Sequence, residues 1–211
     1  MRDIPQIRIK DAWLLREAAS VPMNELRGNG ESLRSDKEYA GIVDSYQKAW
    51  KPYEKKILEG LCRITGLQFR QNIIDVYIAP WFAAFSDPMV IGTRNTPDRF
   101  IDILTHELIH RLLTDNTTLP FDTELVPKWE EMYGRKHSFN TLIHIPVHVV
   151  HKAVYLDVLE SSKRLKRDEN HKIINDYKDY MLSWEYVENR DYKALLKELQ
   201  ESYADLQKDN S

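Results

Sequence analysis

The chain has 211 residues, of which 42% are hydrophobic and 30% charged, and its formal net charge is −3. This composition is typical of an ordinary globular protein, and nothing in it favours nucleic acid or an anionic membrane surface as a partner. The single cysteine excludes an internal disulfide, and no apolar run approaches the roughly 20 residues of a membrane span. Residues 1–10 contain no signal-peptide pattern, so we expect a cytoplasmic protein with one domain over residues 1–211.

The first part of the chain, residues 1–66, is predicted to be mainly helical. Pro52 breaks its longest apolar pattern, because a proline ring and its missing N–H interrupt a helix. The helices on either side of this proline show apolar faces that we interpret as packing surfaces. The predicted elements are a short strand or extended arm at Ile4–Ile9, a short helix at Asp11–Ser20, a loop at Val21–Ser35, and helices at Asp36–Pro52 and Tyr53–Ile64.

Residues 67–116 change character and are predicted to hold a small sheet followed by a helix. Leu67–Ala79 is rich in β-branched and aromatic residues, and Met89–Gly92 is a shorter run of the same kind, so both are predicted strands. Pro80–Pro88 between them is an unusually apolar loop. Thr96-Pro97-Asp98 then combines an N-cap, a proline suited to the first turn and an acid, which predicts the start of a helix.

That helix contains the sequence His106-Glu107-Leu108-Ile109-His110, an HExxH motif. Residues four apart lie on the same helical face, so the two imidazoles can bind one metal ion. Glu107 lies one position further round, where its carboxylate can accept a proton from a water molecule at the metal. The competing interpretation is a pair of partly exposed histidines on an amphipathic helix. We interpret the motif as the metal-binding and general-base part of a hydrolase.

The order of strand, short strand and HExxH helix resembles the zincin metallopeptidases, the family of HExxH zinc proteases, over about residues 67–110. The resemblance implies a small twisted sheet above the active-site helix. It also implies an edge strand that holds an extended peptide through backbone hydrogen bonds. On this resemblance Met89–Thr93 is the edge strand, and Val90, Ile91 and Gly92 bind the substrate.

A catalytic zinc ordinarily needs a third protein ligand and leaves one position open. The glycine-containing extension that supplies a third histidine in some zincins is absent, because Leu113 and Asn116 occupy its two key places. Phe139–Ser161 offers an alternative, since a helix there would place four polar side chains within a sector of roughly 60°. These side chains are His144, His148, His151 and Tyr155.

Among these residues we choose His148 as the third ligand, because it is central in the stripe and follows Pro146, which marks a first turn or a kink. His144 is the alternative ligand. His151 and Tyr155 are predicted to donate hydrogen bonds to the oxygen that becomes negative during hydrolysis, a role that both residue types fill in several zincin families. For each histidine, the competing interpretation is a buried imidazole that is hydrogen-bonded within the core.

The last part, residues 121–211, is predicted to be helical. Lys163–Lys172 is interpreted as a solvated face or turn, because the stretch contains charges of both signs and shows no apolar periodicity. The other elements are a helix at Asp122–Tyr133 ended by Gly134, an apolar stripe of Ile173, Ile174, Tyr177, Tyr180, Met181 and Trp184, and a final helix at Asp191–Leu206.

The sequence thus predicts an α+β protein, mainly α, with a small sheet over the HExxH helix and additional N- and C-terminal helices. The predicted function is a zinc-dependent metallopeptidase that binds Zn2+ through His106, His110 and His148, uses Glu107 as general base, and acts on a peptide or protein. Two alternatives stay open. One is a zinc hydrolase of a non-peptide substrate, and the other is a binding or regulatory protein stabilised by a metal with four protein ligands. The oligomeric state is left open.

Overall fold

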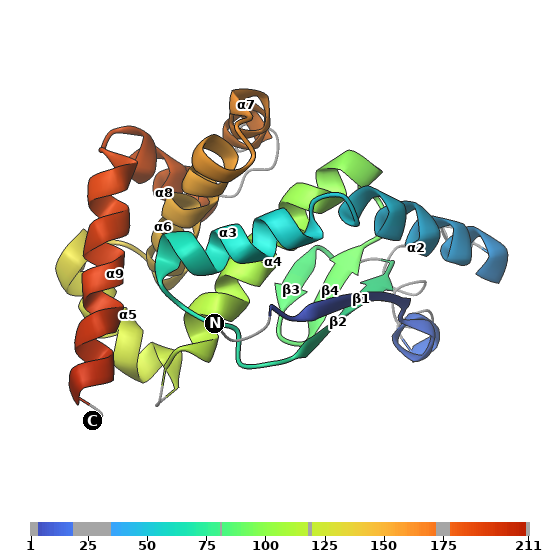
Figure 1. Cartoon of the computed structure of the whole chain (residues 1–211), viewed down its shortest axis with the longest axis horizontal. Helices are drawn as coiled ribbons and strands as arrows, with labels where there is room; N and C mark the ends of the chain where they lie inside the picture. Colours follow the sequence, from blue (N-terminus) through green and yellow to red (C-terminus); the bar gives the residue numbers. More distant parts are fainter. Residues whose placement is uncertain (1–3, 19–34, 81, 118–119, 172–177, 210–211) are drawn as a thin grey trace. The chain divides into compact units, whose positions relative to one another are not determined.

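The computed structural model describes residues 4–18, 35–80, 82–117, 120–171 and 178–209 (Figure 1). The chain divides into two compact units. The sheet unit comprises Asp3–Lys55 and Gln71–Leu108, and the helical unit comprises Lys56–Arg70 and Ile109–Ser211. The described residues form a mainly helical α/β structure with a small mixed sheet. The prediction of one domain over the whole chain stays a prediction.

The sheet unit contains four strands among its described residues, in the order β1-β2-β4-β3 (Figure 1). The first two pairs in this order are parallel, and β3 pairs antiparallel with β4. Apolar residues alternate with exposed ones along β1, as expected for a strand with one buried face, whereas all of β4 is buried. The strands are β1 (Gln6–Asp11), β2 (Ile73–Ala79), β3 (Ala84–Ser86) and β4 (Met89–Gly92).

The prediction that Met89–Thr93 forms an edge strand is wrong. The segment Pro80–Pro88, predicted to be a loop, contains β3, which turns back and pairs with β4 from Ala84 opposite Ile91 to Ser86 opposite Met89. Since β4 also pairs with β2, both of its sides carry sheet partners. Among the described strands, the edges of the sheet are β1 and β3.

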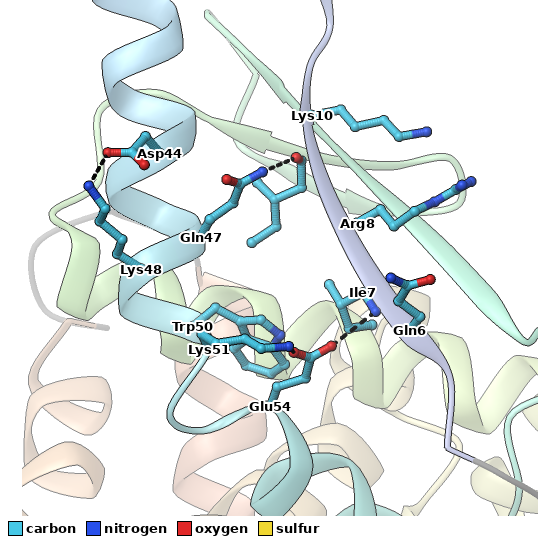
Figure 2. A pocket seen from close by; sticks show the side chains of 11 residues that line it. Gln6, Ile7, Arg8, Lys10, Asp44, Gln47, Lys48, Trp50, Lys51 and Glu54 are labelled. Carbon is cyan, nitrogen blue, oxygen red and sulfur yellow. Dashed lines mark hydrogen bonds and ion pairs between the residues drawn. The ribbon is translucent and has the colours of Figure 1, made fainter.

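Helix α2 (Asp36–Trp50) lies beside β1 and begins at the predicted residue. Ser35 and Glu38 form a capping box, in which each side chain satisfies a backbone N–H of the other residue. Figure 2 shows the groove of about 510 Å³ between this helix and β1. Gln47 Nε2 donates to Ile9 O at 2.8 Å across the groove, so a helix side chain satisfies a polar group on the outer edge of β1.

In the helical unit, α6 is the central helix and packs against α5, α8 and α9 (Figure 1). Its long apolar surface explains this position, because most of its residues from Leu142 to Ala153 are buried. The helices are α3 (Glu54–Thr65), α4 (Pro97–Asp115), α5 (Phe121–Tyr133), α6 (Phe139–Ala153), the π-helical turn η1 (Val154–Val158), α7 (Ser162–His171), α8 (Lys178–Glu188) and α9 (Tyr192–Asp209). Helices α3 and α4 begin in the sheet unit and continue into the helical unit.

Two predictions for the helical unit are corrected by the structure. The α-helix predicted up to Ser161 changes at Val154 into the wider η1 turn, which rotates the following side chains away from an α-helical register. Lys163–Lys172, predicted to be a solvated face or turn, largely forms helix α7, with Asp168 only 1% exposed. The predicted loop up to Arg34 and the stripe residues Ile173, Ile174 and Tyr177 lie outside the described residues.

Within the part of the chain that the structure describes, none of the helices combines the length and the apolar character required to cross a bilayer.

Candidate metal centre

Helix α4 presents His106 and His110 on one face, one turn apart. The helix starts as predicted, because Thr96 Oγ1 accepts a hydrogen bond from the Arg99 backbone N–H at 3.2 Å. On the other faces of α4, apolar side chains such as those of Phe100 and Leu104 are completely buried. The helix is therefore anchored at its start and along its length, and this anchoring positions both imidazoles.

The third histidine of the site is His144 on α6. One ligand atom from each of His106, His110 and His144 lies within 4.8 Å of the other two. The start of α6 is capped by Ser138, whose Oγ accepts from the Thr141 backbone N–H at 3.1 Å. These three side chains form a group that can hold a metal ion, whose identity the geometry leaves open.

The hydrogen bonding of His144 prepares its ring for ligation. Its Nδ1 lies 2.7 Å from the backbone oxygen of Asn140. A carbonyl oxygen only accepts, so Nδ1 carries the proton and Nε2 carries the lone pair that a metal requires. This arrangement, in which a carbonyl orients the ligand from its far side, is common for histidines at metal sites. The His144 ring meets that of His110 edge-on, with centroids 5.0 Å apart.

Burial favours the neutral form of His110 and of His144. Burial, together with the smaller electrostatic effects of the nearby His144 and His151, lowers the pKa of His110 to about 3. Burial also lowers the pKa of His144, although the Asn140 carbonyl opposes this effect. Neutral imidazole is the form that binds metals, so the ligands need not lose a proton at neutral pH.

Glu107 is only 7% exposed, and burial raises the pKa of its carboxyl group to about 8. A buried carboxylate is stabilised by a nearby positive charge, and a divalent cation held by three neutral imidazoles would supply one. The donor set and this buried acid together fit a metal ion. Glu107 is thus a buried acid within the same motif, and its role beside a metal stays a prediction.

His148, chosen from the sequence as third ligand, is not part of the three-histidine group. Its ring is completely buried and stacks on Trp184, with centroids 4.2 Å apart. The Ser183 hydroxyl donates to the Tyr180 backbone oxygen at 2.8 Å, and its oxygen lies 3.0 Å from Nδ1 of His148. The Ser183 oxygen therefore accepts a hydrogen bond from the Nδ1–H of His148, and α8 holds this histidine against the core.

His151 and Tyr155, the two predicted hydrogen-bond donors, lie together with their ring centroids 4.3 Å apart. Both are buried. Nδ1 of His151 also lies 3.5 Å from a carboxylate oxygen of Asp168, a residue that sequence reasoning missed. The one sequence signal for Asp168 is that it is an acid within a run of basic residues. This signal does not predict that its side chain is buried.

The predicted substrate-binding residues Val90, Ile91 and Gly92 lie in β4, where sheet pairing uses the backbone. Gly92 N donates to Ala83 O at 3.1 Å. A Cβ atom on Gly92 would lie 2.2 Å from the backbone oxygen of Phe82, so only glycine fits this close approach. These contacts give Gly92 a structural role in the sheet.

Comparison of the chain with protein-family models, with curated proteins and with solved structures gives no match.

Proposed function

We propose that this protein is a zinc-dependent metallopeptidase that hydrolyses peptide bonds in an extended peptide or protein substrate. The observation that carries the proposal is the convergence of His144 with the two histidines of the HExxH motif. The same motif contributes the buried acid Glu107. The group supplies three imidazole ligands, and Glu107 of the same motif supplies one carboxyl group. The combination is the donor set that metal-assisted hydrolysis requires.

Zinc is the metal that these ligands suit best among common biological cations. Imidazole nitrogens bind zinc, copper, iron and nickel, whereas magnesium and calcium prefer oxygen ligands. Three protein ligands leave room for a fourth position, which is the arrangement of catalytic rather than structural zinc sites. When bound, zinc supplies a Lewis acid that acidifies water and polarises a carbonyl group.

The chain's own residues then perform the proton transfers. Glu107 accepts the proton of the attacking water and delivers it to the nitrogen of the departing amine. His151 and Tyr155 donate hydrogen bonds to the carbonyl oxygen as it becomes negative. Since β4 is paired on both sides, an extended substrate that adds to the sheet would use the outer edge of β3 (Ala84–Ser86).

Metal analysis and hydrolysis assays on the wild type and three variants test this proposal. We expect the purified protein to bind one zinc per chain and to cleave peptides in a mixture of diverse sequences. His144→Ala should lose the zinc, whereas Glu107→Gln should keep the zinc and lose hydrolysis. His137→Ala, which removes a histidine outside the group, should preserve both properties. Full hydrolysis by Glu107→Gln would refute the mechanism.

A metal-stabilised binding protein is the second candidate, and the position of His148 favours it, because its ring centroid lies 5.8 Å from that of His144. A structural zinc has four protein ligands and no open position. X-ray absorption spectroscopy of the zinc protein separates the two proposals. Three imidazoles with one oxygen support an enzyme, and four imidazoles support a structural site.

A zinc hydrolase of a non-peptide substrate would share these ligands. A screen of ester, amide and phosphate substrates distinguishes it from a peptidase.

A further inference from the structure

A polar groove lies along the outer edge of β1, within the sheet unit (Figure 2). Its volume of about 510 Å³ falls within the range of about 300–1,000 Å³ that is typical of ligand pockets. One wall is formed by residues 6–10 of β1, and the other by side chains of α2 together with that of Glu54. None of the three histidines of the candidate metal centre lines this groove, so it is a separate candidate binding site.

The backbone of β1 has one side in the sheet and the other side in the groove. In a parallel pair of strands, each residue directs its N–H and C=O to the same side, and successive residues alternate between the two sides. Gln6 N donates to Asn72 O at 2.9 Å, just before β2, so the even-numbered residues of β1 face β2. Ile7 and Ile9 therefore direct their backbone groups into the groove.

Two side chains use half of the four backbone groups of Ile7 and Ile9. Glu54 Oε1 accepts from Ile7 N at 3.2 Å, and Gln47 Nε2 donates to Ile9 O at 2.8 Å. No described residue forms a hydrogen bond with Ile7 O or with Ile9 N. The groove thus presents one backbone acceptor and one backbone donor, between two groups that are already satisfied.

This acceptor and donor match one residue of an added parallel strand. In a parallel ladder, the residue opposite Arg8 donates its N–H to Ile7 O and accepts a hydrogen bond from Ile9 N. An antiparallel residue would use both groups of Ile7 or both groups of Ile9, and one group of each is already taken. Protection of the strand edge accounts for Gln47 and Glu54, but it leaves the pair between them available to a ligand.

The side chain of this ligand residue would lie beside Arg8. Residues that are directly opposite in neighbouring strands share one face of the sheet, and Figure 2 shows that Arg8 and Lys10 point away from α2. Both cations pair with the same acid, Asp75, at 2.7 Å and 2.8 Å. Two positive charges share one negative charge, so an acidic side chain in the ligand complements Arg8 from its other side.

We propose that the groove binds an extended peptide segment parallel to β1, with an aspartate or glutamate opposite Arg8. Glu54 and Gln47 occupy the flanking backbone groups, so pairing ends after this one residue and the recognised segment is short. The site lies at the edge of the sheet opposite β3. The inference goes beyond the proposed function, because it requires neither the metal nor hydrolysis.

Binding of the peptide acetyl-Ala-Glu-Ala-amide to the full-length, nitrogen-15-labelled protein tests the inference by NMR. We expect the amide signal of Ile9 to shift and its hydrogen exchange to slow, because Ile9 N gains an acceptor. The amide of Lys10, which faces β2, should change little. The same peptide with an N-methyl group on its glutamate lacks the donor for Ile7 O and should bind at least about fivefold more weakly. An Ile9 signal that stays unchanged at about 10 mM peptide would overturn the proposal.

The acidic preference is tested with a second peptide and two protein variants. Acetyl-Ala-Lys-Ala-amide should bind about 2- to 10-fold more weakly than the glutamate peptide, because its charge repels Arg8. Arg8→Gln should reduce this difference in affinity. Lys37→Gln, the matched control, removes an exposed cation of α2 outside the groove and should preserve it. Equal affinities of the wild type for the two peptides would overturn the proposal.

A nitroxide label at the N-terminus of the glutamate peptide reports the direction of binding. In the parallel arrangement the label lies near the start of β1, so it should broaden the amide signal of Gln6 more than that of Asp11. The opposite pattern would overturn the parallel arrangement. A peptide that shifts only the amides of β3 binds the other edge of the sheet, which would support the proposed function but overturn this site.

Discussion

Replacing Gly60 with alanine is expected to destabilise the helical unit, because this glycine lies where α3 meets the π-helical turn η1. A Cβ atom at Gly60 would lie 2.7 Å and 2.8 Å from the two methyl carbons of Val158. Overpacking of this kind costs about 1–3 kcal/mol, and the better helix propensity of alanine returns about 1 kcal/mol. The net loss of unfolding free energy should be about 0–2 kcal/mol.

Gly41 on α2 supplies the matched control. It is an exposed glycine inside a helix, and a Cβ atom there meets nothing within 4 Å. Gly41→Ala should therefore raise the unfolding free energy by about 0.5–1 kcal/mol. Urea unfolding of both variants measures the difference, and hydrogen exchange of the Val158 region localises it. A Gly60→Ala protein as stable as Gly41→Ala would refute the packing argument.

Three further predictions concern the metal site, the N-terminus of α6 and the sheet. His148→Phe preserves the stack on Trp184 and should retain zinc, whereas His144→Ala should lose it. If metal analysis shows that His148→Phe loses zinc and His144→Ala retains it, His148 is the ligand. Hydrogen bonds from Ser138 and Thr141 lower the pKa of Asp179, so Asp179→Asn should cost about 1 kcal/mol at pH 7. A carboxyl group with a lowered pKa stabilises the fold only at pH values above that pKa. The difference in unfolding free energy between the wild type and Asp179→Asn, measured by urea unfolding, should therefore shrink as the pH falls toward 3. Gly92→Ala should destabilise the sheet unit by more than about 2 kcal/mol in the same assay, because the clashing atom is backbone.

Local signals in the sequence predicted the helix that carries the HExxH motif. Its start is determined by Thr96 and Pro97, which act within one turn of the chain. The same holds for Asp36 after its Ser35 cap and for the end of α5 at Gly134, whose φ of 106° favours glycine. In each case the decisive interaction lies within a few residues of the signal, so the local sequence is enough to predict where the helix starts or ends.

Other features were missed because tertiary packing decides them. β3 spans three residues, and its pairing with β4 outweighs the weak local pattern of a proline-flanked loop. Asp168 lies in a highly charged stretch, yet its side chain is 1% exposed and lies 3.5 Å from His151 on another helix. The η1 turn breaks the regular rotation of 100° per residue on which the stripe through Tyr155 was based.

The third ligand shows where periodicity stops being informative. His144, His148 and His151 lie on one face of α6, so helical geometry alone cannot rank them. Their partners differ instead: Asn140 leaves the Nε2 lone pair of His144 beside His110, whereas Trp184 and Ser183 hold His148 against α8. Three histidines on one stripe thus acquire three different environments: a group that can hold a metal ion, a stack on Trp184, and a position beside the Asp168 carboxylate. Each environment is set by the neighbouring element that the stripe meets.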